Sequence, residues 1–245
     1  MAIYLKKFET QAAYEAAQSG LILPNVSLTV DNNTVHYNPS TPPAPSHDYV
    51  EIGGIKWATM NIGANSVTDN GLYFEWGGTS GYTAAQVGYD EEQKYFGENG
   101  NIFYDPETSN YTKYNGEDEL TTLQSSDDAV TAAWGGNWRM PTTAEYESLL
   151  NSVTTAWTAD YQGSGVAGAT LTDNNDSSKV LFFPACGYAD EGMIYSTNTY
   201  GEYWTSSLNG EGDRYSDCFS FVNDNAGVGG TSRYGGKIVR GILDE

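Results

Sequence analysis

The stretch AAWGGNWRMPTTAEYESLL, residues 132–150, carries the strongest local folding signals in the chain. Thr142 and Glu145 have the Ser/Thr-x-x-Glu spacing of a capping box, in which each side chain bonds the backbone N–H of the other residue. The apolar residues that follow recur at the i, i+3, i+4 and i+7 positions of one helix face: Tyr146, Leu149, Leu150 and Val153. The pattern predicts a helix that begins directly after Thr142.

A shorter helix is predicted just upstream, because Ser125–Asp128 resemble another capping box and Gly135 can end a helix. Its small-residue face consists of Ala129, Ala132 and Ala133. Most other apolar residues between 48 and 245 occur in short runs separated by glycines, which is typical of short strands joined by ordered loops. No fixed-period repeat is present. These features predict an α+β fold with two helices and a loop-rich antiparallel sheet.

Residues 1–38 are expected to form a small segment of their own. AIYLKKF (2–8) predicts a strand, and AAYEAAQS (12–19) predicts a helix with Thr10 as N-cap and Gly20 as its end. Such a short segment cannot bury much surface alone, so it needs the main domain or other copies of itself as a neighbour.

Two further strands complete this β-α-β-β segment. VSLTV (26–30) and TVHY (34–37) flank Asp31–Asn33, which predicts a hairpin with Asx-type turn chemistry. PSTPPAPSH (39–47) then contains four of the eight prolines, a composition that favours an extended linker. We therefore predict an attachment or oligomerisation segment at 1–38, a linker at 39–47 and a ligand-binding domain at 48–245.

The net charge of the chain argues against two classes of binding partner. The 245-residue chain has 11 basic and 32 acidic residues and a net charge of −21. Nucleic acids and anionic membranes attract clustered lysine and arginine, so neither is an expected partner. No apolar run approaches the roughly 18 residues of a spanning helix, and MAIYLKKFETQ lacks the apolar block of a secretory signal. We expect a cytoplasmic protein, a component assembled into a particle, or a mature product whose leader has been removed.

The sequence offers little for catalysis. The only histidines, His36 and His47, lie in the predicted hairpin and linker, so no Ser/His/Asp or Cys/His set can be proposed in the main domain. Cys186 and Cys218 are too few for a disulfide framework or a Cys-based zinc site. They could form one disulfide, but two small buried residues in neighbouring strands are the simpler interpretation. We expect no enzymatic activity and no cofactor.

Two acidic stretches could offer oxygen ligands to calcium: DNNDSS (173–178) and NGEDELTTLQSSDD (115–128). Neither has the glycine and terminal glutamate of an EF-hand loop. We interpret both as solvated acidic loops, and a structural calcium ion stays an open alternative.

Aromatic and basic residues of the main domain are expected to be structural. The tryptophans interpreted as core residues are Trp57, Trp76, Trp134, Trp138 and Trp157. Arg139 and Arg240 are expected to pair with acidic residues inside the fold, because basic residues are few.

Several pieces, taken in order, resemble one family. They are IKWATMNIGA (55–64), GLYFEWG (71–77), AAWGGNWRMPTTAEYESLL, VLFFPACGY (180–188), GEYWTSS (201–207) and RYGGKIVRG (233–241). Together they resemble a C-type-lectin-fold domain of the formylglycine-generating-enzyme-like subtype. The similarity is to the paralogous domain of Bacteroidetes and to the variable proteins of diversity-generating retroelements, and it covers about residues 48 to 243. The N-terminal YLKKF and LPNVSLTV pieces resemble the start of structural proteins of Bacteroides phage tails.

The C-terminal stretch from Tyr195 to Tyr234 is dominated by Gly, Ser, Asn, Asp and Tyr, the residues that antibody-like binding loops use. By composition alone, an ordinary Gly/Asn-rich surface loop is the favoured interpretation. The resemblance implies variable, ligand-binding positions at Asn209, Glu211, Asp213, Tyr215, Asp217, Asn223, Asp224, Asn225, Tyr234 and Lys237. It implies fixed scaffold positions at Tyr203, Trp204, Arg233, Gly236, Val239 and Arg240.

The resemblance, together with the lack of a catalytic residue set, implies receptor binding without catalysis. Formylglycine-generating enzymes use a closely spaced cysteine pair, whereas the two cysteines here lie 32 positions apart. We expect a homotrimeric phage tail or fibre component, assembled in the bacterial cytoplasm beside other tail proteins, that binds a host surface glycan or protein. The alternative is a lectin-like structural or glycan-binding protein of the Bacteroidetes cell surface.

Overall fold

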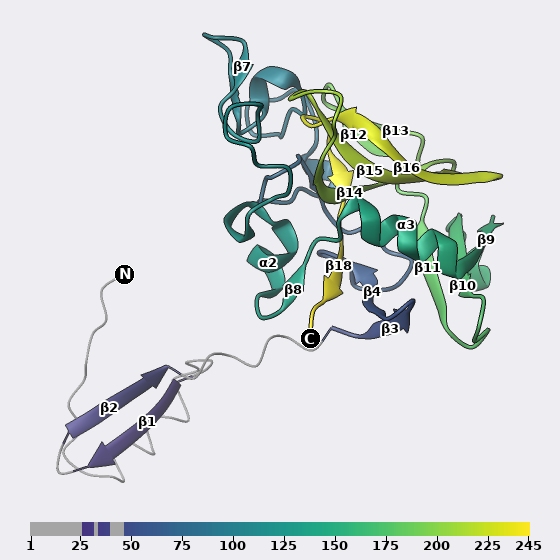
Figure 1. The fold of residues 1–245 in the computed structure, drawn as a ribbon, viewed down its shortest axis with the longest axis horizontal. Helices are drawn as coiled ribbons and strands as arrows, with labels where there is room; N and C mark the ends of the chain where they lie inside the picture. Colours follow the sequence, from purple (N-terminus) through teal and green to yellow (C-terminus); the bar gives the residue numbers. More distant parts are fainter. Residues whose placement is uncertain (1–25, 32–33, 40–46) are drawn as a thin grey trace. The chain divides into compact units, whose positions relative to one another are not determined.

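The computed structural model describes residues 26–31, 34–39 and 47–245. The chain divides into two compact units, Met1–Pro45 and Ser46–Glu245, and this boundary falls within the Pro-rich stretch (Figure 1). The predicted strand at 2–8, the predicted helix at 12–19 and the Asn32–Asn33 turn lie outside the described residues.

The first unit contains the predicted hairpin. Strand β1 (Val26–Asp31) pairs antiparallel with β2 (Thr34–Pro39), so that Val26 lies opposite Pro39 and Asp31 opposite Thr34. The hairpin is confirmed, and its second strand continues as far as Pro39.

The second unit is a mixed α+β structure built from small, mostly antiparallel sheets. Its largest sheet has the order β16-β15-β14-β17-β5, and only the β14–β17 pairing within it is parallel. The five strands are β5 (Tyr73–Phe74), β14 (Gly201–Leu208), β15 (Tyr215–Val222), β16 (Asn225–Ser232) and β17 (Lys237–Ile238).

A four-stranded sheet brings the two ends of this unit together, because β4 pairs with the last strand, β18. In the order β3-β4-β18-β8 it contains β3 (Tyr49–Ile52), β4 (Ile55–Asn61), β18 (Arg240–Leu243) and β8 (Trp138–Arg139).

Smaller sheets make up the remainder. A three-stranded sheet has the order β11-β10-β9, with β9 (Val153–Thr158), β10 (Gly168–Asp173) and β11 (Val180–Pro184). The two-stranded ones pair β6 (Tyr104–Asp105) with β7 (Asn110–Tyr111), and β12 (Tyr188–Asp190) with β13 (Met193–Tyr195).

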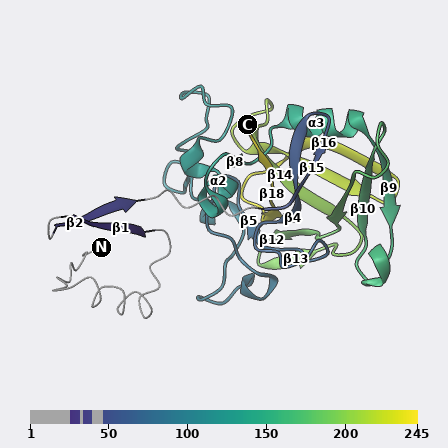
Figure 2. The ribbon, with the colours of Figure 1, turned by 90° about the horizontal axis from the view of Figure 1, so that it is seen from below.

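Helix α3 (Thr143–Ser152) confirms the helix that was predicted to begin directly after Thr142. The Thr142 side chain accepts from the Glu145 N–H, and the Glu145 carboxylate accepts from the Thr142 N–H at 2.7 Å. Tyr146 and Leu149 are buried, and the helix ends where Val153 begins β9. The packing of α3 on β14, β15 and β16 encloses the core (Figure 2).

Helix α2 (Ala129–Trp134) is shorter than its sequence pattern suggested. Asp128 is its N-cap, with its carboxylate accepting from the Thr131 N–H at 2.8 Å, and Gly135 ends it at a positive φ. The predicted start at Ser125 is wrong, because Ser125–Asp127 form a separate 3₁₀ turn, η3. The alanine face is wrong in part, because Ala132 and Ala133 are exposed. The other 3₁₀ turns are η1 (Ala84–Gln86), η2 (Glu98–Gly100) and η4 (Tyr161–Gly163).

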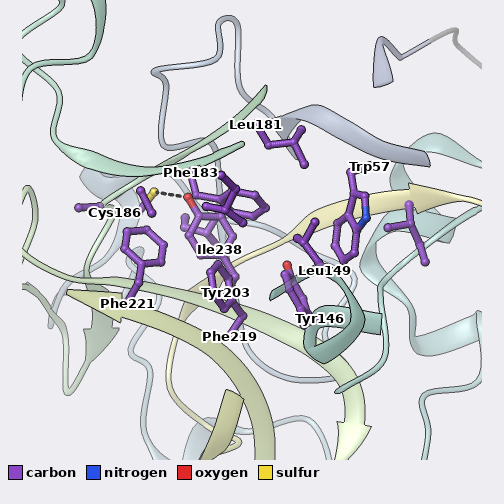
Figure 3. Packing of buried hydrophobic residues seen from close by; sticks show 14 of the residues in the cluster. Trp57, Tyr146, Leu149, Leu181, Phe183, Cys186, Tyr203, Phe219, Phe221 and Ile238 are labelled. Atoms are coloured by element: carbon purple, nitrogen blue, oxygen red, sulfur yellow. Dashed lines mark hydrogen bonds between the residues drawn. The ribbon is translucent and has the colours of Figure 1, made fainter. Parts of the chain in front are cut away.

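The core is aromatic. Phe219 of β15 stacks on Tyr146 of α3 with ring centroids 5.0 Å apart, and Phe183 packs edge-on to Phe219 and to Tyr203 (Figure 3). Four of the five tryptophans interpreted as core are buried, namely Trp57, Trp76, Trp134 and Trp138, whereas Trp157 on β9 is only half-buried.

Candidate ligand-binding face

The ten predicted ligand-binding positions fall at two opposite ends of one β-hairpin. Asn223, Asp224 and Asn225 lie at the turn between β15 and β16. The other end holds the 209–214 loop that precedes β15 and the 233–237 segment that follows β16. An eight-residue ladder separates the two ends, a length of about 24 Å at 3.4 Å per residue. The structure therefore does not gather the ten residues into one patch.

Exposure also divides them. Those with exposed side chains are Glu211, Asp213, Tyr215, Asn223, Asp224 and Asn225, while Asn209, Asp217 and Tyr234 are half-buried. The carboxylate of Asp217 accepts from the Thr143 hydroxyl at 2.7 Å and from the Asn209 amide, and the Asn209 carbonyl accepts from the Glu211 N–H. Asn209 and Asp217 thus attach the loop to α3.

Lys237 departs most from the expectation of an exposed contact. It is only 2% exposed. Its ammonium lies 3.2 Å from Glu202 Oε2 and 4.3 Å from the centre of the Trp204 ring. A buried cation needs such a partner, because removing charge from water is costly. Lys237 therefore does not belong to the exposed face.

All six predicted scaffold residues are buried. Arg233 has the clearest role, because its guanidinium donates to the carbonyls of Lys113, Tyr114 and Asp213. It also lies 4.2 Å from the Tyr111 ring centre. Burial lowers the pKa of Arg233 to about 10, which leaves it charged at neutral pH. Through the Asp213 carbonyl, buried Arg233 attaches the 209–214 loop to the interior of the domain.

Arg240 corrects a prediction, because it has no acidic partner. Its Nε and Nη2 both donate to Asn61 Oδ1, at 2.9 and 2.7 Å, and Nη1 donates to the Phe182 carbonyl at 2.8 Å. The guanidinium lies 4.1 Å from the Phe183 ring centre, and burial lowers its pKa. Arg139, by contrast, pairs with Glu145 and Asp244 as expected.

A pocket of about 290 Å³ opens on the sheet face away from α3. Asp217 and Phe219 contact α3, so Ser216, Cys218 and Ser220 point to the other face, where Glu202 lies opposite Ser220. The pocket lining consists of Tyr188, Asp190, Tyr200, Glu202, Thr231, Ser232, Tyr234, Gly235 and Lys237. Sequence reasoning named only Tyr234 and Lys237 among these as binding residues.

For the pocket residues that were not predicted, the sequence contains only a weak indication of a binding role. Tyr188 and Tyr195 flank an acidic turn in YADEGMIY, a composition close to that of the stretch singled out downstream. Glu202 directly precedes Tyr203 and Trp204, and no neighbouring residue marks it as part of a binding site. Nothing in the local sequence indicated that these segments converge.

The polar groups of the pocket are unequally satisfied. Glu202 Oε1 accepts from the Tyr200 hydroxyl at 2.8 Å, and Oε2 faces Lys237. The Oδ1 atom of Asp190 is buried and has no hydrogen-bond partner. Burial, reinforced by the neighbouring Glu191 carboxylate, raises the pKa of Asp190. An unpartnered buried carboxylate oxygen is costly, and a ligand that donates a hydrogen bond would remove that cost.

The cysteines are free and buried. Cys186 follows β11 and Cys218 lies in β15, so they are not in neighbouring strands as interpreted. Burial raises the pKa of each thiol to about 12. The Cys186 Sγ is 3.3 Å from the Tyr203 hydroxyl (Figure 3). Neither thiol has the thiolate character that nucleophilic catalysis requires.

The acidic loops are occupied by the protein's own donors. Asp118 accepts from the backbone N–H groups of Tyr114, Asn115 and Leu120, and Asp173 accepts from those of Asn175 and Asp176. Within residues 47–245 and the described hairpin, no group of three or more His, Cys, Asp or Glu side chains is placed to hold a metal ion.

Comparison of the chain with protein-family models, with curated proteins and with solved structures found no match. Among the helices in the described part of the chain, none combines the length and apolar character needed to cross a membrane.

Proposed function

We propose that this chain is a non-enzymatic receptor-binding protein whose C-terminal face contacts the ligand. The observation that carries the proposal is the contrast between the 209–215 loop and what lies beneath it. Glu211, Asp213 and Tyr215 expose their side chains, while buried Arg233 and half-buried Asp217 fix the loop from inside. Side chains presented in this way can change without disturbing the core, which suits a recognition surface.

The fold subtype belongs to the same proposal. A C-type lectin-like fold is supported by the collinear sequence pieces and by a mixed architecture of two helices on mostly antiparallel sheets in the described residues. The absence of a reactive thiol supports a binding role over that of a formylglycine-generating enzyme.

The biological setting that we propose is a phage tail or fibre, with residues 1–38 attaching the protein to the virion or to sister copies. The resemblance of the N-terminal pieces to Bacteroides phage tail proteins supports it. A trimer would raise the avidity of a modest single contact through effective concentration. The alternative, a Bacteroidetes cell-surface protein, predicts a leader or lipoprotein cysteine encoded upstream of Met1, whereas the phage setting predicts neighbouring tail genes.

Binding of the fluorescently labelled full-length protein to a panel of Bacteroidetes strains tests the function. We expect at least one strain to bind, and the triple variant Glu211→Ala/Asp213→Ala/Tyr215→Ala to lower binding at least tenfold. The control is Tyr49→Ala, which removes an exposed tyrosine from β3, a strand of the other sheet. Full binding by the triple variant, or binding by no strain, would refute the proposal.

A further inference from the structure

We infer that the pocket between β12, β14 and the segment after β16 binds one sugar residue of a neutral glycan. This inference rests on the proposed function, since it assigns a ligand class to a pocket that adjoins the 209–215 loop, where Ser232 of the lining pairs with Tyr215.

The walls provide aromatic faces. Tyr188 and Tyr200 meet at an interplanar angle of 88° with centroids 6.1 Å apart, which forms a corner of two ring planes. A pyranose ring has an apolar face of C–H groups that packs on such a plane, while its hydroxyl groups point to the side. At about 290 Å³ the pocket lies just below the usual range for ligand pockets, so it suits a single ring.

The hydrogen-bonding groups suit hydroxyls. Asp190 Oδ1 is an acceptor without a donor, and the Lys237 ammonium has three N–H bonds but a single ion-pair partner, Glu202. A sugar hydroxyl can donate to Asp190 and accept from Lys237. An ammonium ligand could donate to Asp190 but offers no acceptor for the N–H groups of Lys237.

The net negative charge of the pocket disfavours anionic ligands. Asp190 and Glu202 carry two negative charges against the one positive charge of Lys237, in a protein with a net charge of −21. Phosphates and acidic sugars would therefore be repelled. A neutral, hydroxyl-rich ring avoids this repulsion and satisfies both Asp190 and Lys237.

An exposed aromatic surface continues from the pocket. Tyr195 stacks on Tyr188 with ring centroids 5.5 Å apart. A second aromatic pair, Tyr89 and Tyr95, has its own two ring centroids 6.0 Å apart. Tyr89 is 69% exposed, and its ring lies against Gly192 in the β12–β13 turn. Exposed tyrosines side by side offer stacking positions for further sugar units of a chain held by the pocket.

An array of neutral, anionic and amino glycans, probed with the full-length protein, tests the inference. We expect binding to neutral glycans, and we expect Asp190→Asn to weaken it at least tenfold while keeping the side-chain shape. Asp48→Asn, the same change at an exposed aspartate just before β3 in the four-stranded sheet, serves as the matched control and should bind normally. Tyr89→Ala should weaken oligosaccharides severalfold and leave methyl glycosides unaffected.

Three results would overturn the inference: binding to no neutral glycan, binding confined to charged glycans, or equal binding by Asp190→Asn. Cell binding distinguishes this failure from failure of the proposed function. If the protein still binds cells and the loop triple variant does not, only the sugar assignment is wrong. If cells are not bound at all, both proposals fail.

Discussion

Arg233 and Arg240 are both fully buried, yet each holds a different part of the molecule. Arg233 binds loop carbonyls beneath the candidate face, whereas Arg240 joins β18 to β4 through Asn61 and to β11 through Phe182. Neither has a carboxylate partner within hydrogen-bond distance. The planar guanidinium suits this task, because it presents several donors in fixed directions and still packs on aromatic rings.

Arg240→Met should therefore lower the free energy of unfolding by about 3 kcal/mol, because the Asn61 and Phe182 oxygens lose their donors in a buried site. Urea unfolding followed by tryptophan fluorescence measures it. Arg214→Met, which removes an exposed arginine paired with Glu98, should leave the midpoint unchanged. Equal midpoints for the two variants would contradict the role given to Arg240.

At the scale of single elements, the capping box decides where α3 begins. Thr142→Ala removes one half of the reciprocal pair and should cost about 1 kcal/mol of stability. Thr155→Ala, an exposed threonine of β9, is the matched control. Thermal unfolding should show a lower midpoint for the first variant and little change for the second; the reverse order would be evidence against the cap.

Elements were predictable from the sequence where the interactions are local. The α3 cap spans three residues and the β1–β2 hairpin spans one turn, so both can be read from neighbouring positions. The partners of residues that interact over long distances in the sequence were not predictable. Arg240 and its acceptor Asn61 are 179 positions apart, and nothing near Arg240 shows that this acceptor is neutral.

The candidate site was predictable in part for the same reason. The loop positions were predicted from the family resemblance, and the composition of the stretch is only compatible with it. The burial of Lys237 depends on Glu202, which lies in a different strand, and the pocket needs β12 as well. Alternation along β15 and β16 could not reveal that one hairpin separates the predicted residues into two groups, because the register was unknown.

At the scale of the whole molecule, the division into two compact units at Pro45 and Ser46 leads us to predict that the second unit folds alone. Its core and both described α-helices lie within residues 46–245. Deleting residues 1–38 should abolish assembly and leave the urea midpoint of the remaining domain unchanged. Size-exclusion chromatography with light scattering, combined with urea unfolding, measures both. Unfolding of the truncated chain would show that the two units are interdependent.

The most direct test of the account is deep sequencing of the last fifty codons of the gene across a passaged population, with the upstream codons as control. The account predicts substitutions at adenine positions in the codons of exposed residues such as Glu211, Asp213 and Tyr215, and none at Trp204 or Arg233. A uniformly constant 3′ end, or substitutions spread equally over exposed and buried positions, would contradict the claim that this face is a variable binding surface on a fixed scaffold.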